Sequence, residues 1–181
     1  MKSTPLYIVR LALTLLIITS VVAAALAGVN AITAPKIAAI TAQKTQDAIE
    51  AVLPGGGEKL ENFSDDTGLV KTIYASEAGY AVEVTPAGFD GQISMMVGVD
   101  KDGKVLGIDI ISHTETAGLG AVAAADNSAG ESFRNQFQGA EGALSVTKDG
   151  GTVDAITGAT ITSRAVTAGV NAAVACVASL G

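Results

Sequence analysis

A run of small and hydroxyl-bearing residues near the C-terminus has the composition of an anion-binding turn. The stretch 154–164 reads Asp-Ala-Ile-Thr-Gly-Ala-Thr-Ile-Thr-Ser-Arg, so Thr160 directly follows a glycine and an alanine. A helical spacing of apolar residues starts at Arg164, and Ser163 can cap that helix. The free N–H groups of a first helical turn attract anions, with a gain of about 0.3 to 1 kcal/mol per charge from the helix field. The sequence therefore predicts that a phosphate can lie beside the Thr160 hydroxyl.

The same stretch resembles the flavinylation motif, an acidic residue followed by Ser/Thr-Gly-Ala-Thr, in which a transferase esterifies the last threonine with the phosphate of FMN. The resemblance implies a covalent phosphodiester link at Thr160 and an FMN-binding role for the neighbouring residues Thr157, Gly158, Ala159, Thr162 and Ser163. The alternative is a strand-to-helix turn in which the threonines only cap a helix. Lys148 lies close to the motif, and we expect it to be a solvated turn lysine rather than a phosphate ligand.

A second segment, 112–120, resembles the Glu-Thr-Pro-Gly-Leu-Gly loop that faces the isoalloxazine ring in the same family. It reads Ser-His-Thr-Glu-Thr-Ala-Gly-Leu-Gly, so Ala117 stands where the family usually has proline, and we expect a less rigid loop. The residues that the resemblance places at the ring are Glu115, Thr116, Gly118, Leu119 and Gly120. Their types suit the role, because glycines let the backbone approach a flat ring, leucine offers an apolar face, and glutamate and threonine offer polar contacts. The alternative is a flexible glycine turn, with His113 as an ordinary loop residue.

Together with Gly91–Ile111 and Phe133–Phe137, these segments resemble the FMN-binding domain shared by two kinds of redox subunit. These are the G subunit of Rnf-type ferredoxin:NAD oxidoreductases and the C subunit of sodium-pumping NADH:quinone reductases. The resemblance covers most of the chain after about Ala48, and the short length favours the Rnf branch.

The resemblance implies a subunit that relays electrons through FMN in an ion-translocating complex. Its partners would be membrane and iron–sulfur subunits, with a flavin transferase for maturation. We expect no complete active site, no catalytic base and no NAD site in this chain, which has no Gly-x-Gly-x-x-Gly fingerprint after a strand. Three alternatives remain: a C-like subunit of a quinone reductase, a free-standing exported flavoprotein reductase, and an exported binding module without flavin.

The N-terminal part of the chain is apolar enough to enter a bilayer. Residues Leu11–Val29 carry no charge, and the whole chain has a mean hydropathy of +0.44. About 20 such residues span the hydrocarbon core as a helix. Lys2 and Arg10 precede the run, which predicts a cytoplasmic N-terminus and an extracytoplasmic domain, although Lys36 and Lys44 weaken this bias. A cleaved signal peptide is the alternative, and it exports the domain as well.

Charge and cysteine content exclude several classes of function. The net charge is −7 and the chain has no cluster of Lys and Arg, so nucleic acid is not expected as a partner. Acidic pairs such as Asp65-Asp66 predict solvated turns rather than a metal site. Cys176 is the only cysteine, which excludes an internal disulfide and a four-thiolate iron–sulfur site within this chain. We expect it to pack as a small apolar residue.

The pattern of the remaining chain predicts an α+β fold with one membrane helix and a mainly antiparallel sheet flanked by helices. We divide it into a cytoplasmic N-terminus with anchor (1–29), a connecting helix with a Gly-rich turn (30–57) and the FMN-binding domain (58–181). The elements that we expect are an amphipathic helix at 37–53, strands at 70–74, 80–85, 93–99 and 105–111, short helices at 121–126 and 131–137, and a pairing of 143–147 with 152–156. A turn at 100–103 joins the last two strands into a hairpin. The expected core residues are Ile93, Val97, Val99, Leu106, Ile108 and Ile110.

Overall fold

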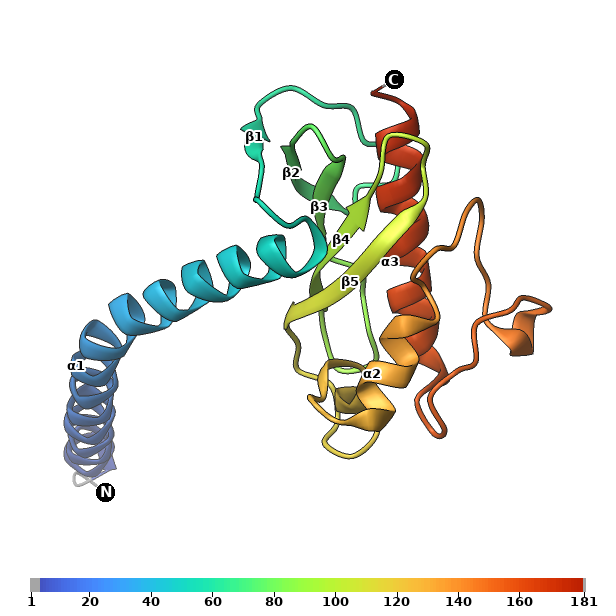
Figure 1. The fold of residues 1–181 in the computed structure, drawn as a ribbon. Helices are drawn as coiled ribbons and strands as arrows, with labels where there is room; N and C mark the ends of the chain where they lie inside the picture. Colours follow the sequence, from blue (N-terminus) through green and yellow to red (C-terminus); the bar gives the residue numbers. More distant parts are fainter. Residues whose placement is uncertain (1–3, 181) are drawn as a thin grey trace. The chain divides into compact units, whose positions relative to one another are not determined.

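The computed structural model describes residues 4–180 and has the α+β architecture expected from the sequence. Contacts divide the chain into two compact units, one up to Ala42 and one from Gln43 onward. Residues 4–42 of the first unit are helical, and the second unit holds the sheet and the candidate site (Figure 1).

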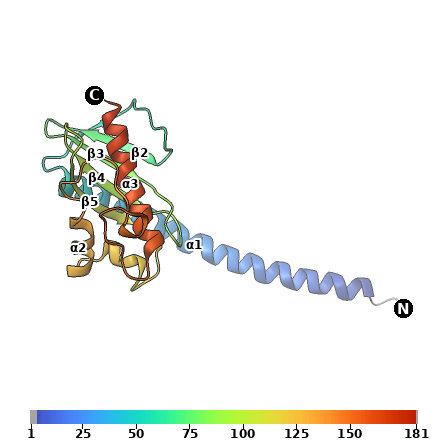
Figure 2. The ribbon, with the colours of Figure 1, turned by 90° about the vertical axis from the view of Figure 1, so that its right-hand side faces the viewer.

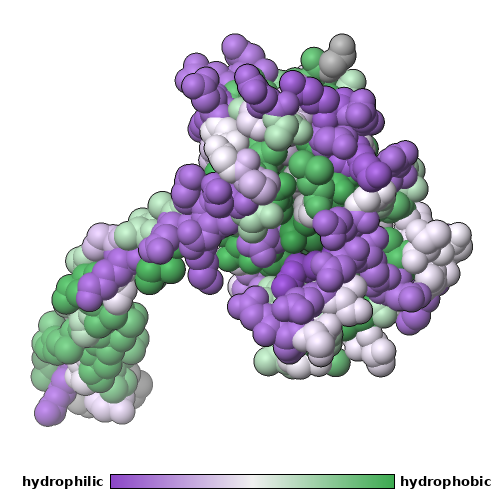
Figure 3. Space-filling model, viewed as in Figure 1, coloured by the Kyte–Doolittle hydropathy of each residue, from purple (hydrophilic) through white to green (hydrophobic). Residues whose placement is uncertain are grey.

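Helix α1, Thr4–Val52, is continuous and contains Pro35. The anchor and the connecting helix expected from the sequence are therefore parts of one helix, which continues past Pro35 although this residue cannot donate a backbone hydrogen bond. Apolar side chains from Leu6 to Ile40 are exposed, and Figure 3 shows hydrophobic surface along this part of α1. Helix α1 is long and apolar enough to cross a membrane. Lys2, which entered the orientation argument, lies outside the described residues.

The second unit is built on an antiparallel meander. Its strands are β1 Glu58–Leu60, β2 Val70–Ala75, β3 Tyr80–Val84, β4 Ser94–Val99 and β5 Val105–Ser112, and their order in the sheet is their order in the sequence. The four longer strands confirm the expected ones. The β4–β5 hairpin also forms as expected, with Asp100 Oδ1 accepting hydrogen bonds from the backbone N–H groups of Asp102 and Lys104.

Both faces of the sheet are covered, and successive side chains along a strand contribute to opposite faces. Helix α3, Thr160–Ala178, lies along one face, where its apolar side chains pack with alternate residues of β3 and β4 such as Val82 and Val97 (Figures 1 and 2). The last turns of α1 pack on the other face through Ile49 and Val52, and Leu53 directly after the helix joins the same cluster. Four of the six expected core residues are buried (Ile93, Val97, Val99 and Ile108), and Leu106 and Ile110 are half-buried.

Three short helices lie between β5 and α3: η1 Gly120–Ala124, α2 Ser128–Asn135 and η2 Thr147–Asp149. The two short helices expected from the sequence exist, but α2 begins earlier because the Asn127 side chain accepts hydrogen bonds from the N–H groups of Ala129 and Gly130.

The pairing expected between 143–147 and 152–156 forms at one point only. A single isolated parallel bridge joins Val146 and Val153, with hydrogen bonds from the Thr147 N–H to the Val153 carbonyl and from the Val153 N–H to the Ser145 carbonyl. The Asn171 side chain of α3 bonds both the N–H and the C=O of Leu144, at 2.8 Å each, and these are the backbone groups that a strand ladder would need.

Candidate functional site

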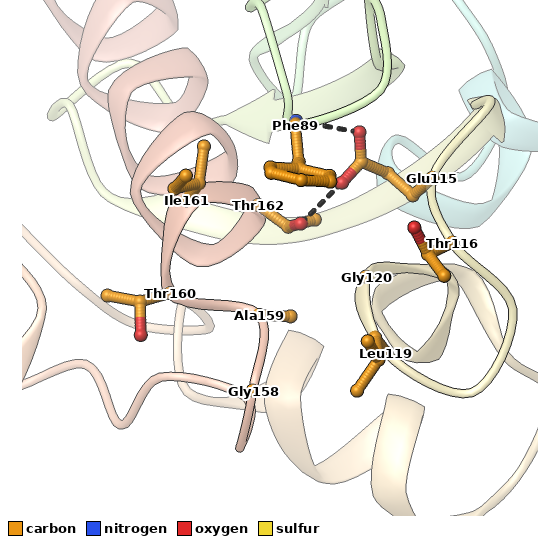
Figure 4. A pocket seen from close by; sticks show the side chains of 10 residues that line it. All are labelled: Phe89, Glu115, Thr116, Leu119, Gly120, Gly158, Ala159, Thr160, Ile161 and Thr162. Carbon is orange, nitrogen blue, oxygen red and sulfur yellow. Dashed lines mark hydrogen bonds between the residues drawn. The ribbon is translucent and has the colours of Figure 1, made fainter.

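A cavity of about 330 Å³ lies between the loop after β5 and the start of α3 (Figure 4). Its lining includes eight of the eleven residues expected at the flavin: Glu115, Thr116, Leu119, Gly120, Gly158, Ala159, Thr160 and Thr162. Gly118, Thr157 and Ser163 do not line it. Two lining residues, Phe89 and Ile161, were missed by sequence reasoning. Phe89 comes from the β3–β4 connection, so only the tertiary fold brings it to the site.

Three apolar side chains at this cavity are unusually exposed. Phe89 is 67% exposed, Ile161 is 50% exposed and Leu119 is 44% exposed. Between residues 53 and 180 these are all of the large apolar side chains that are exposed. They come from three separate segments and all border the same cavity. A flat apolar ligand bound there would cover these side chains.

Glu115 fastens these segments to one another. Its side chain is buried, its Oε1 accepts from the N–H groups of Phe89 and Asp90 at 2.9 and 3.0 Å, and its Oε2 accepts from the Thr162 hydroxyl. The loop after β5, the β3–β4 connection and α3 are thus joined at one carboxylate. Both oxygens are engaged by the protein, so the role of Glu115 is to hold the walls of the cavity (Figure 4).

Two glycines make room for this carboxylate. A Cβ atom at Gly88 would collide with Glu115 Oε1, and a Cβ at Gly120 would lie 2.6 Å from Glu115 Oε2. Gly120 was expected to let the backbone approach a ring. In the structure, its lack of a side chain leaves space for the Glu115 carboxylate.

The loop 116–119 turns on Gly118. The Leu119 N–H donates to the Thr116 carbonyl at 3.1 Å, and Gly118 has φ +74, which suits glycine at the third position of a type II turn. Ala117 occupies the second position, where proline is favoured. His113 has a local structural role, since its Nδ1 accepts from the Glu115 N–H at 3.2 Å.

Helix α3 begins four residues earlier than expected. Thr160 is its first residue, Ala159 is in the N-cap position, and no side chain caps the helix. Ser163 is therefore not the cap: it is buried within the helix, where its Oγ donates to the Ala159 carbonyl and accepts from the Ile156 N–H. The N–H groups of an uncapped first turn are available to an anion at Thr160.

A cation also lies at this helix end. Lys148 Nζ donates to Thr160 Oγ1 at 2.9 Å, so Lys148 is not merely the solvated turn lysine expected from the sequence. Its neighbour Asp149 accepts two hydrogen bonds from the Arg164 guanidinium, at 2.6 and 2.7 Å. These hydrogen bonds hold the pKa of the Asp149 carboxyl below its usual value and raise the pKa of Arg164.

Within residues 4–180, no group of three His, Cys, Asp or Glu side chains is arranged to hold a metal ion. Cys176 is buried on α3, as expected. Burial and the nearby carboxylates of Asp65 and Asp66 raise the pKa of its thiol.

Comparison with known proteins agrees with this geometry. Residues 88–175 match the model of the FMN-binding domain, a range that includes every residue of the cavity. The chain is 34% identical to the G subunit of the Na⁺-translocating ferredoxin:NAD⁺ oxidoreductase complex of Acetobacterium woodii, with 90% of this chain and 87% of the relative covered. It is 39% identical to the G subunit of the proton-translocating complex of Clostridium ljungdahlii, with 82% and 80% covered.

A third relative is the G subunit of the ion-translocating oxidoreductase complex of Methanosarcina acetivorans, 31% identical with 92% of this chain and 93% of the relative covered. Identity at this level over nearly the full length of both chains establishes the family. The chain belongs to the G subunits of Rnf-type ion-translocating oxidoreductase complexes and contains their FMN-binding domain.

Proposed function

We propose that this chain is an electron-transfer subunit of a membrane-bound, ion-translocating ferredoxin:NAD⁺ oxidoreductase complex, and that its FMN is joined to Thr160 by a phosphodiester. The observation that carries the proposal is the convergence of Phe89, Leu119 and Ile161, the three exposed apolar side chains of residues 53–180, on a cavity that the half-buried Thr160 borders. FMN is a flat ring joined to a phosphate. The apolar walls fit the ring, and the uncapped helix end at Thr160 fits the phosphate.

When bound, FMN supplies reversible electron transfer, which is the chemistry of the cofactor itself. The residues of this chain position it and limit the access of water. Glu115 holds the three walls together, while Gly158 and Ala159 place no bulky side chain before Thr160 in the chain. No proton transfer by a side chain is needed for this role.

We also propose that α1 spans the membrane once, with its N-terminus in the cytoplasm and the FMN-binding domain outside. Arg10 precedes the uncharged run of α1, which supports this orientation through the positive-inside tendency. A covalent link suits an exported domain, because it removes the entropic cost of rebinding a nucleotide that would be lost by diffusion.

The partners that we propose follow from the names of the relatives, which are subunits of complexes that act on ferredoxin and NAD⁺. Other membrane subunits and iron–sulfur subunits would deliver and accept the electrons, and a flavin transferase would attach the FMN. The immediate donor and acceptor would dock where the flavin reaches the surface, beside Phe89.

The test is a Thr160→Val variant produced beside the wild type in cells that contain a flavin transferase. We expect the wild type to fluoresce on a denaturing gel under ultraviolet light, and its mass to exceed that of the bare polypeptide by one FMN less one water. We expect the variant to show neither property. Thr160→Ser keeps a hydroxyl at the same place and should keep the flavin. Equal fluorescence of wild type and Thr160→Val would overturn the assignment of the link.

A further inference from the structure

We propose that Lys148 is the phosphate-binding residue of this site: it forms an ion pair with the phosphate of the flavin nucleotide at Thr160. The inference rests on the proposed function for the identity of the ligand. Its own basis is the position of one ammonium group and the ion pairs around it.

The geometry is direct. Lys148 Nζ lies 2.9 Å from Thr160 Oγ1, the atom that becomes the ester oxygen in a phosphodiester. The non-bridging phosphate oxygens are bonded to the same phosphorus as that oxygen, so they come within reach of a lysine head group that can rotate about its flexible stem. A hydrogen bond from an ammonium to a charged phosphate oxygen is roughly twice as strong as one between neutral groups.

The charges around Thr160 leave Lys148 as the available cation. Arg164 is also exposed near the start of α3, but its guanidinium is bound by both oxygens of Asp149. Lys148 forms no ion pair with any carboxylate in residues 4–180. Its positive charge is therefore free to meet an anion, and the uncapped first turn of α3 begins at the same residue, Thr160.

The turn that carries Lys148 is held in position. The Thr147 N–H donates to the Val153 carbonyl at 2.8 Å, the Asp149 N–H donates to the Val146 carbonyl at 2.8 Å, and the Asp149–Arg164 pair fastens the turn to α3. Lys148 is thus presented to Thr160 by an ordered segment, which lowers the entropic cost of binding the phosphate.

The experiment separates the contribution of the phosphate to flavin binding from the contribution of the ring. In a Thr160→Val background, which removes the proposed link, the full-length chain in detergent is titrated with FMN and with riboflavin, and binding is followed by flavin fluorescence. We expect tighter binding of FMN than of riboflavin. Lys148→Gln should weaken FMN binding about five- to tenfold, the order of one exposed ion pair, and should leave riboflavin binding unchanged.

The matched control is Lys101→Gln, which removes the same charge from the exposed turn between β4 and β5 and should change neither affinity. Equal affinity for FMN and riboflavin with Lys148 intact would overturn the proposal. An equal loss of affinity for FMN and riboflavin in Lys148→Gln would also overturn the proposal, since it would indicate a general disturbance of the site.

A second measurement uses the chain with Thr160 intact. The ³¹P resonance of the attached phosphodiester should shift in Lys148→Gln and stay in place in Lys101→Gln, and an unshifted resonance in Lys148→Gln would count against the ion pair. If the protein carries no covalent flavin by mass, the proposed link at Thr160 fails, while the titrations with free FMN and riboflavin still decide the role of Lys148.

Discussion

The Thr162 hydroxyl donates a hydrogen bond to Glu115 Oε2, a contact between two buried side chains that are 47 residues apart in the sequence. Thr162 belongs to the first turn of α3 and Glu115 to the loop after β5, so this bond joins the two segments in which the sequence suggested flavin contacts. The other oxygen of Glu115 holds the backbone that carries Phe89. The cavity lies where these three segments are bonded to one carboxylate.

The first prediction concerns that carboxylate. Glu115→Gln should lower the free energy of unfolding by about 1.5–3 kcal/mol, because hydrogen bonds to a charged acceptor are lost or weakened. Thermal unfolding of the full-length chain in detergent would measure the change. Glu77→Gln, at an exposed turn position, is the control and should have little effect. Equal stability of the two variants would show that Glu115 does not hold the cavity together.

The second prediction concerns the loop 116–119. Ala117 lies in the turn position that favours proline, and Gly118 lies in the position that requires a positive φ. Ala117→Pro should therefore stabilise the chain by about 0.4–1 kcal/mol by restricting the unfolded state, whereas Gly118→Ala should destabilise it by about 1 kcal/mol or more. Paired unfolding measurements would test this, and the same sign for both substitutions would contradict the turn assignment.

The sequence predicted those parts of the fold that have a strong local signal. The strands β2 to β5 are rich in apolar residues, many of them Val, Ile or Met, and the Asp100–Gly103 turn marks a hairpin. Strand β1 was missed because it has only three residues, Glu-Lys-Leu, of which one is apolar. The pairing around Val146 is limited to one bridge to Val153, because Asn171, distant in sequence, takes the backbone groups of Leu144.

The same distinction holds for the site. The hydroxyl and glycine motifs could be found by their spacing, and most of them do lie at one cavity. Phe89 and Lys148 could not be assigned in this way, because each reaches the site through tertiary contacts that leave no local pattern. The start of α3 was placed too late because Ser163 looks like a cap, yet it bonds Ile156 from inside the helix.

The third prediction is a pH dependence at the Asp149–Arg164 pair. The hydrogen bonds from Arg164 lower the pKa of Asp149 in the folded state, so the pair contributes stability above the ordinary pKa and loses it as the pH falls through the lowered value. An NMR titration of the Asp149 carboxyl carbon should give a midpoint below 3.8, the ordinary value for this group. Arg164→Gln should move the midpoint upward, and an unchanged midpoint would contradict the pairing.

The fourth prediction compares two glycines that face each other in register on β4 and β5, Gly98 and Gly107. A Cβ at Gly98 would collide with the carbonyl oxygen of Val52 at the end of α1, while nothing lies within 4 Å of a Cβ at Gly107. Gly98→Ala should cost about 1–3 kcal/mol, because the last turn of α1 must move away from the sheet. Gly107→Ala should cost much less, and equal losses in denaturant unfolding would contradict this packing.

The last prediction concerns Phe89 as a wall of the flavin site. Phe89 is 67% exposed without a ligand, and an apolar ring of that size gains by covering another flat ring. Phe89→Ala should leave the flavin attached, since Thr160 is unchanged, but should raise the quenching of flavin fluorescence by iodide about twofold, because such sites bury most of their ligand. Phe89→Tyr keeps the wall and should resemble the wild type. If the flavin of Phe89→Ala is quenched by iodide no more than that of Phe89→Tyr, the flavin ring does not lie against residue 89.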